Sequence, residues 1–203
     1  MAYRSAITLY CEAHCVAGHG VRMVVAEKDI NITTAVTTRA GRSEDLLSLN
    51  PYDEVLTLVD RDVALYEPQI MLEYLDERFP HPPLMPIDPM GRAVNRQVRI
   101  RLERELIPLM KSLQSGGSKG DAAGVVLRDH ITALAPGFAP GAYLLSPEFS
   151  LADCVLAPML WQLRQMGIEL PAAAKSVRQY SERVFARPSF RLRLEPQSAA
   201  RSR

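Results

Sequence analysis

The chain has 203 residues, a mass of 22.6 kDa and a formal net charge of +1, with 47% hydrophobic and 23% charged residues. This composition is typical of a folded globular protein and excludes a disordered chain or capture of nucleic acid or membrane by bulk charge. The longest apolar run, residues 154–161, is far shorter than the ~20 residues of a membrane-spanning helix. Three cysteines make no disulfide framework, so we expect a reducing compartment, the cytoplasm.

Charge is divided unevenly along the chain. Residues 1–86 carry 7 Lys and Arg against 13 Asp and Glu, whereas residues 87–203 carry 17 against 10. This asymmetry indicates either two domains with different electrostatic partners or an acidic layer packed against a basic one. The sequence leaves both alternatives open.

The first part of the chain alternates strand and helix patterns. Residues 7–10 predict a strand, residues 21–27 a helix that opens near residues 18–20, and residues 32–38 a second strand. A strand, a helix and a strand within about thirty residues form a βαβ unit with parallel strands. A helix after Ser43, a hairpin over residues 56–66 and a helix opened by Glu67 and Pro68 complete the order β-α-β-α-β-β-α.

Strand patterns end at a proline-rich stretch, residues 79–86. Each proline there fixes φ and restrains the residue before it, which predicts a rigid extended segment. The remainder is expected to be all-α, with helices over residues 92–110, 121–134, 151–166 and 172–185. We therefore expect a first domain at residues 1–82, a helical domain at 88–196 and a disordered tail at 197–203.

Ser150 and Asp153 have the spacing of a capping box ahead of an apolar helix. In this pattern a serine and a carboxylate three residues later each accept a hydrogen bond from a backbone N–H that the helix leaves free. We interpret the pair as structural and not catalytic.

The element order resembles the glutathione-transferase fold, a thioredoxin-like α/β domain followed by an all-α bundle. Short strings support this resemblance: Leu49-Asn50-Pro51, Thr57-Leu58-Val59-Asp60, and Ser150-Leu151-Ala152-Asp153. Two further strings, Val25-Ala26-Glu27-Lys28 and the fourteen residues 73–86, resemble the stringent starvation protein A family of RNA-polymerase-associated bacterial proteins. The resemblance covers nearly the whole chain.

The fold resemblance implies where glutathione would bind. The position facing its thiol is Cys11, the position expected to be a cis-proline is Leu56 after Val55, and the pair for the γ-glutamyl end is Glu67 and Pro68. A cis bond before a non-proline residue costs about 2.5–4 kcal/mol, so we expect a trans Val55–Leu56 bond. Pro68 offers neither a hydroxyl nor an N–H. We therefore interpret these positions as a vestigial site and expect no catalysis and no cofactor.

Alternatives keep a chemical role for the thiols. Cys11 near a helix N-terminus could be partly ionised, which would suit a glutathione-dependent transferase or, with Cys15, a thiol redox protein. Zinc held by Cys11, His14, Cys15 and His19 is a weaker alternative, because one short loop closes a tetrahedral site poorly. We expect no metal.

The residues Pro80, His81, Pro82 and Pro83 are the expected partner-binding surface. Such a segment has little conformational entropy to lose on docking, and His81 supplies a polar group. A stiff interdomain linker is the alternative. The family resemblance implies that the matching Pro-His-Pro lies on a surface required for action at RNA polymerase and its sigma factor.

The resemblance also implies the wider set of partners. We expect bacterial RNA polymerase holoenzyme with its sigma factor under stress, and a dimer with a second copy or a paralogue. Arg92, Arg96 and Arg99 have helical spacing and predict either a solvated face or a contact for acidic partner surface. No motif for sequence-specific DNA binding is present in the sequence, and no membrane contact is expected.

Overall fold

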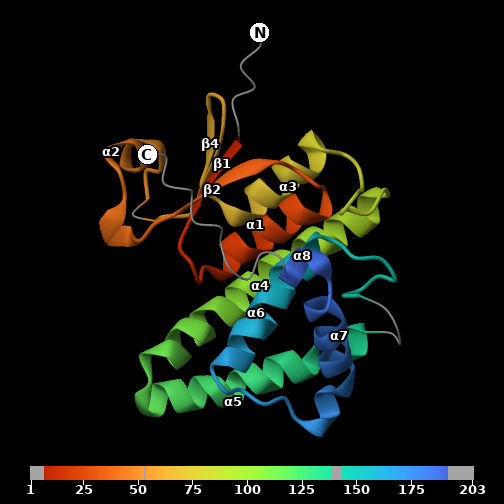
Figure 1. The fold of residues 1–203 in the computed structure, drawn as a ribbon. Coiled ribbons are helices and arrows are strands. Elements are labelled where there is room, and N and C mark those ends of the chain that lie inside the picture. Colours follow the sequence, from red (N-terminus) through yellow and green to blue (C-terminus); the bar gives the residue numbers. More distant parts are fainter. Residues whose placement is uncertain (1–6, 53, 139–142, 192–203) are drawn as a thin grey trace. The chain divides into compact units, whose positions relative to one another are not determined.

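The computed structural model describes residues 7–52, 54–138 and 143–191 (Figure 1). The chain divides into a first unit, Met1–Pro82 with Pro188–Arg203, and a second unit, Pro83–Arg187. The division at Pro82 falls within the proline-rich stretch where strand patterns end. The tail expected at residues 197–203 lies outside the described residues.

A four-stranded mixed sheet forms the centre of the first unit. Its order is β2-β1-β3-β4, with β1 parallel to β2 and the other neighbours antiparallel. The strands are β1 (Ile7–Cys11), β2 (Ile32–Val36), β3 (Thr57–Asp60) and β4 (Val63–Leu65). The helices are α1 (Val16–Glu27), α2 (Glu44–Leu49) and α3 (Pro68–Arg78). The expected β-α-β-α-β-β-α order is confirmed, and with it the thioredoxin-like domain.

Helix α1 begins earlier than residues 18–20, where the glycines suggested its start. Cys15 is the N-cap, and its sulfur accepts a hydrogen bond from the Gly18 N–H at 3.2 Å. Helices α1 and α3 lie against each other (Figure 1), and each buries apolar side chains, among them Val24 and Val25 of α1 and Leu75 of α3. This packing fixes the ends of the two helices, where the candidate site lies.

A short helix, α8 (Pro188–Arg191), belongs to the first unit and not to the helical domain in which we expected residues 88–196. Phe190 is fully buried, and its ring lies 4.6 Å from the His19 ring of α1. The Ser189 hydroxyl hydrogen-bonds the Glu27 carboxylate. The burial of Phe190 and the hydrogen bond of Ser189 offset part of the conformational entropy that the four residues of α8 lose, and they hold α8 against α1.

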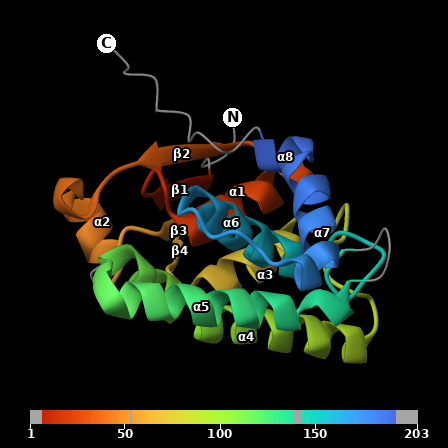
Figure 2. The same ribbon diagram turned by 90° about the horizontal axis from the view of Figure 1, so that it is seen from below.

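The second unit is all-α, as expected. Its helices are α4 (Pro89–Ser115), α5 (Gly117–Ala133), α6 (Leu151–Gln165) and α7 (Lys175–Phe185), with short 3₁₀ turns at Ala135–Gly137 and Ala172–Ala174. Helices α4 and α5 lie side by side (Figure 2). Most of α6 is buried. Among the described residues, no helix has both the length and the apolar character needed to cross a bilayer.

Candidate partner-binding site

Four exposed residues, Pro80, His81, Pro82 and Pro83, form what we call the 80–83 segment. It begins two residues after the end of α3. The first three residues close the first unit and Pro83 opens the second. The bond between His81 and Pro82 is cis. Proline rings and one imidazole are thus accessible to a partner along the segment.

Lys28, which ends one of the two strings that carry the family resemblance but has no role predicted from the sequence, binds the backbone on both sides of Pro80 and His81. Its Nζ donates to the Phe79 carbonyl at 2.6 Å and to the Pro82 carbonyl at 2.7 Å. The same Nζ lies 2.8 Å from the Asp76 Oδ1, and the Lys28 side chain is fully buried. An ammonium has three N–H donors and no acceptor, so three oxygens satisfy it.

The helices α1 and α3 bring these groups together. Lys28 directly follows the last residue of α1, and Asp76 lies in the last turn of α3. A buried ammonium without partners would cost several kcal/mol, and here the carboxylate and two carbonyls offset that cost. The packing of α1 on α3 therefore sets the position of the backbone next to His81.

Cys11, the position expected to face a thiol ligand, is the last residue of β1 and has no solvent-exposed surface. The buried Arg22 donates from Nη1 to the Cys11 sulfur at 3.2 Å. Burial raises the pKa of the Cys11 thiol, and this effect exceeds the lowering by the Arg22 charge. The alternative in which Cys11 is partly ionised near a helix N-terminus finds no support here, because the loss of solvent outweighs the neighbouring charge and raises the pKa of the thiol.

Cys15 and His19 are also engaged in structural contacts, whereas His14 is exposed. Burial raises the pKa of the Cys15 thiol, whose sulfur caps α1. Burial lowers the pKa of His19 to about 4, and its Nε2 lies 3.4 Å from the Phe190 carbonyl oxygen. Within the part of the chain that the structure describes, no three His, Cys, Asp or Glu residues gather as a metal site requires.

The position expected to carry a cis-proline in the fold has a different geometry here. Among peptide bonds between described residues, the cis one is His81–Pro82, so the Val55–Leu56 bond is trans. The side chains of Val55 and Leu56 are buried. Asn50 fixes this loop from inside, because its Nδ2 donates to the Thr57 hydroxyl oxygen at 3.1 Å.

Glu67 and Pro68 begin α3 without a side-chain cap. Glu67 is exposed, occupies the N-cap and makes no side-chain hydrogen bond to the helix. Pro68 follows as the first helical residue. A proline there removes one of the free N–H groups with which a helix N-terminus binds a carboxylate. This end of α3 is thus poorer in donors than an ordinary helix N-terminus.

The capping box expected at Ser150 and Asp153 is present at the start of α6. The Ser150 N–H donates to Asp153 Oδ2 at 2.8 Å, and the Ala152 N–H donates to the Ser150 hydroxyl oxygen at 3.3 Å. The Leu144 N–H donates to the other carboxylate oxygen at 2.9 Å. Burial raises the pKa of Asp153 to about 6 despite these hydrogen bonds.

The expected arginine face of α4 is interrupted. Arg99 is 1% exposed, and its Nε donates to the Asn95 side-chain oxygen at 2.9 Å. Arg99 therefore cannot share a solvated face with Arg92 and Arg96. The guanidinium group instead satisfies a buried amide within the second unit.

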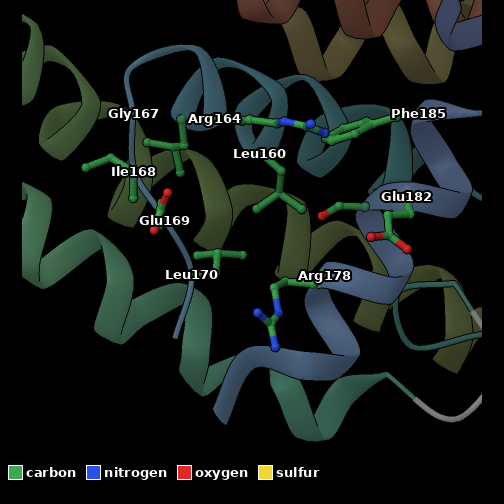
Figure 3. A pocket seen from close by; sticks show the side chains of 11 residues that line it. Leu160, Arg164, Gly167, Ile168, Glu169, Leu170, Arg178, Glu182 and Phe185 are labelled. Atoms are coloured by element: carbon green, nitrogen blue, oxygen red, sulfur yellow. The ribbon is translucent and has the colours of Figure 1, made fainter. Parts of the chain in front are cut away.

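A separate cavity of about 520 Å³ lies in the second unit between α6 and α7 (Figure 3). Leu160 and Phe185 line it, together with charged side chains of both signs such as Arg164, Arg178 and Glu182. None of the residues expected to bind glutathione or a partner lines this cavity. Because the lining carries both positive and negative side chains, it favours neither an anionic nor a cationic ligand. We therefore assign this cavity no part in the candidate partner-binding site.

Comparison with known proteins agrees with this architecture. The family model of the glutathione S-transferase N-terminal domain matches residues 9–83, and that of the C-terminal domain matches residues 120–183. A solved structure of glutathione transferase Omega 3C from Trametes versicolor superposes with a TM-score of 0.83 at 24% identity, covering 96% of this chain and 90% of that chain. The protein therefore has the glutathione S-transferase fold.

Relatives of similar sequence show to which family within this fold the chain belongs. A stringent starvation protein A homolog from Histophilus somni is 41% identical over 189 residues, which cover 92% of this chain and 89% of the relative. A maleylacetoacetate isomerase from Pseudomonas aeruginosa is more distant, at 26% identity over 198 residues, 90% of this chain and 93% of that protein. The chain belongs to the stringent starvation protein A family.

Proposed function

We propose that this chain is a non-catalytic protein that binds bacterial RNA polymerase holoenzyme with its sigma factor and alters promoter use under stress. The 80–83 segment is the contact surface. The observation that carries the proposal is that Pro80, His81 and Pro82 are exposed while their flanking backbone is held from inside by Lys28. A fixed and accessible segment loses little entropy on binding.

Family membership supports this choice of partner. The string that contains the segment is the one whose resemblance to stringent starvation protein A implies polymerase association. The charge difference between residues 1–86 and 87–203 would orient the encounter without adding much affinity.

The same positions argue against glutathione chemistry. A thiolate is the reactive form of cysteine, and the pKa of Cys11 is raised. The trans bond before Leu56 re-aims the backbone that would pair with the tripeptide, and Pro68 removes an N–H. Each lost hydrogen bond to a charged group is worth about 1.5–3 kcal/mol. Two such losses turn a micromolar site into one in the millimolar range.

A dimer with a second copy or a paralogue is the second part of the proposal. Met90, Val94 and Ile100 on α4 are 78%, 43% and 42% exposed, and Val125 and Val126 on the neighbouring α5 are also exposed. Met90 and Val94 lie one turn apart on the same face of α4, and exposed apolar side chains that lie together on one helix face are typical of a surface that another protein covers.

A capture experiment with purified RNA polymerase holoenzyme tests the proposal. Immobilised wild-type chain should retain the holoenzyme, and the His81→Ala/Pro82→Ala variant should not. The matched control is His14→Ala/Pro147→Ala, which removes an exposed histidine and an exposed proline elsewhere. Equal capture by wild type and the His81→Ala/Pro82→Ala variant would refute the assigned surface. If the wild-type chain turned over glutathione and the Cys11→Ala variant did not, the alternative of a glutathione-dependent transferase would be favoured.

A further inference from the structure

We infer that Lys28 is a positioning residue for the 80–83 segment. Its buried ammonium holds together the two ends of the turn at residues 79–82, and this turn presents His81. The effect of Lys28 on binding rests on the proposed function, whereas its effect on the conformation of the turn does not. Lys28 itself is buried, so it acts on a partner only through the 80–83 segment.

The backbone of this segment has few donors with which to fix its own shape. The chain bends at Phe79, His81 and Pro82, and we call residues 79–82 the turn. Three of the four residues of the 80–83 segment are prolines, which have no N–H, so His81 alone offers a backbone donor there. The Lys28 Nζ donates to the carbonyls of Phe79 and Pro82, the two ends of the turn, at 2.6 and 2.7 Å. A side-chain ammonium thus supplies donors that the proline backbone lacks.

The choice of lysine follows from the arrangement of the acceptors. Two carbonyl oxygens and the Asp76 Oδ1 all lie within 2.8 Å of one nitrogen atom. A compact ammonium matches three oxygens that converge on a point, whereas the planar fork of a guanidinium does not. We therefore expect Lys28→Arg to keep the charge and still fail to close the turn.

A purely structural ion pair between α1 and α3 is the competing explanation. It predicts that removal of either charged partner has the same effect. The geometry predicts a difference, because Asp76 binds the ammonium and Lys28 also binds the turn. Asp76→Asn keeps both carbonyl contacts, whereas Lys28→Met/Asp76→Asn loses them without leaving a buried carboxylate unpaired.

The test measures first the conformation of the turn and then the affinity for the holoenzyme. The His81 imidazole signal in the NMR spectrum, identified among the four histidines by its loss in His81→Ala, reports the environment of the turn. We expect Asp76→Asn to leave this signal at the wild-type position and Lys28→Met/Asp76→Asn and Lys28→Arg to shift it. An unchanged signal in the Lys28→Met/Asp76→Asn variant would overturn the inference.

Affinity for the holoenzyme then tests the consequence. If the released turn adopts the docking geometry in about a tenth of the molecules, the apparent Kd rises about tenfold. We expect that rise for Lys28→Met/Asp76→Asn and a change of less than about twofold for Asp76→Asn. Equal weakening in both variants would overturn the positioning role. A wild-type chain that binds no holoenzyme would instead refute the proposed function, and the His81 signal would still decide whether Lys28 orients the turn.

Discussion

The Arg22 guanidinium and the Cys11 sulfur form a hydrogen bond of 3.2 Å within the first unit, and both side chains are buried. A cation beside a thiol ordinarily lowers its pKa. Here the pKa of Cys11 is raised, because the loss of solvent exceeds the effect of the Arg22 charge. The position that would face the thiol of glutathione therefore holds a shielded, protonated thiol at neutral pH.

Cys11 should consequently resist alkylation in the native protein. At pH 8 we expect iodoacetamide to modify Cys11 roughly 100-fold more slowly in the folded chain than in guanidinium chloride, because burial limits both ionisation and access. Mass spectrometry of a Cys15→Ser variant isolates the Cys11 rate, and serine preserves the helix cap. Similar rates in folded and unfolded protein would show that Cys11 is reactive.

The order of elements in the first unit was predictable because strand and helix periods are local properties of the sequence. The capping box was predictable for the same reason, since Ser150 and Asp153 are three residues apart. The contact between Lys28 and Pro82 joins positions 54 residues apart. No periodicity reports which side chain reaches a distant carbonyl, so this part of the candidate site required the structure.

Two other features of the structure differ from the sequence-based prediction because of tertiary packing. A helical pattern places Arg99 in line with Arg92 and Arg96, but it does not reveal that Asn95 accepts a hydrogen bond from Arg99 in the interior. The four residues of α8 are too few to carry a recognisable pattern, and α8 joins the first unit through the burial of Phe190.

Asp153 should make stability depend on pH in the second unit. Its pKa is raised to about 6, chiefly by burial. Between the unfolded pKa and pH 6 the native state binds more protons than the unfolded state, so the free energy of unfolding falls as pH rises. The difference of about two units between the native and unfolded pKa values corresponds to about 2 kcal/mol between pH 4.5 and pH 7, because part of the change lies below pH 4.5.

Urea unfolding at pH 4.5 and pH 7 of wild type and Asp153→Asn measures this contribution. The Asp153→Asn variant should lack this fall in stability. The free energy of unfolding of the variant minus that of wild type should therefore be larger at pH 7 than at pH 4.5. Asp129→Asn, which changes an exposed carboxylate of α5, should show no such pH-dependent difference. A constant difference between wild type and Asp153→Asn at both pH values would contradict the raised pKa.

The exposed apolar face of α4 should be buried in a dimer. Met90→Asp/Val94→Asp places two carboxylates on this face, and desolvating them would cost several kcal/mol, enough to shift the chain to monomer. Sedimentation equilibrium measures the change. Leu145→Asp is the control, since Leu145 is 49% exposed and lies outside α4 and α5. An unchanged association constant in Met90→Asp/Val94→Asp would place any dimer interface elsewhere.

Whether the 80–83 segment binds RNA polymerase holoenzyme is decided by the equilibrium Kd between this chain and the holoenzyme. Substitutions at the centre of a small contact surface commonly cost more than about 1.4 kcal/mol, a factor of ten in Kd. We expect Kd to rise at least about tenfold for His81→Ala/Pro82→Ala and less than about twofold for His14→Ala/Pro147→Ala. Indistinguishable Kd values for wild type and His81→Ala/Pro82→Ala would contradict it.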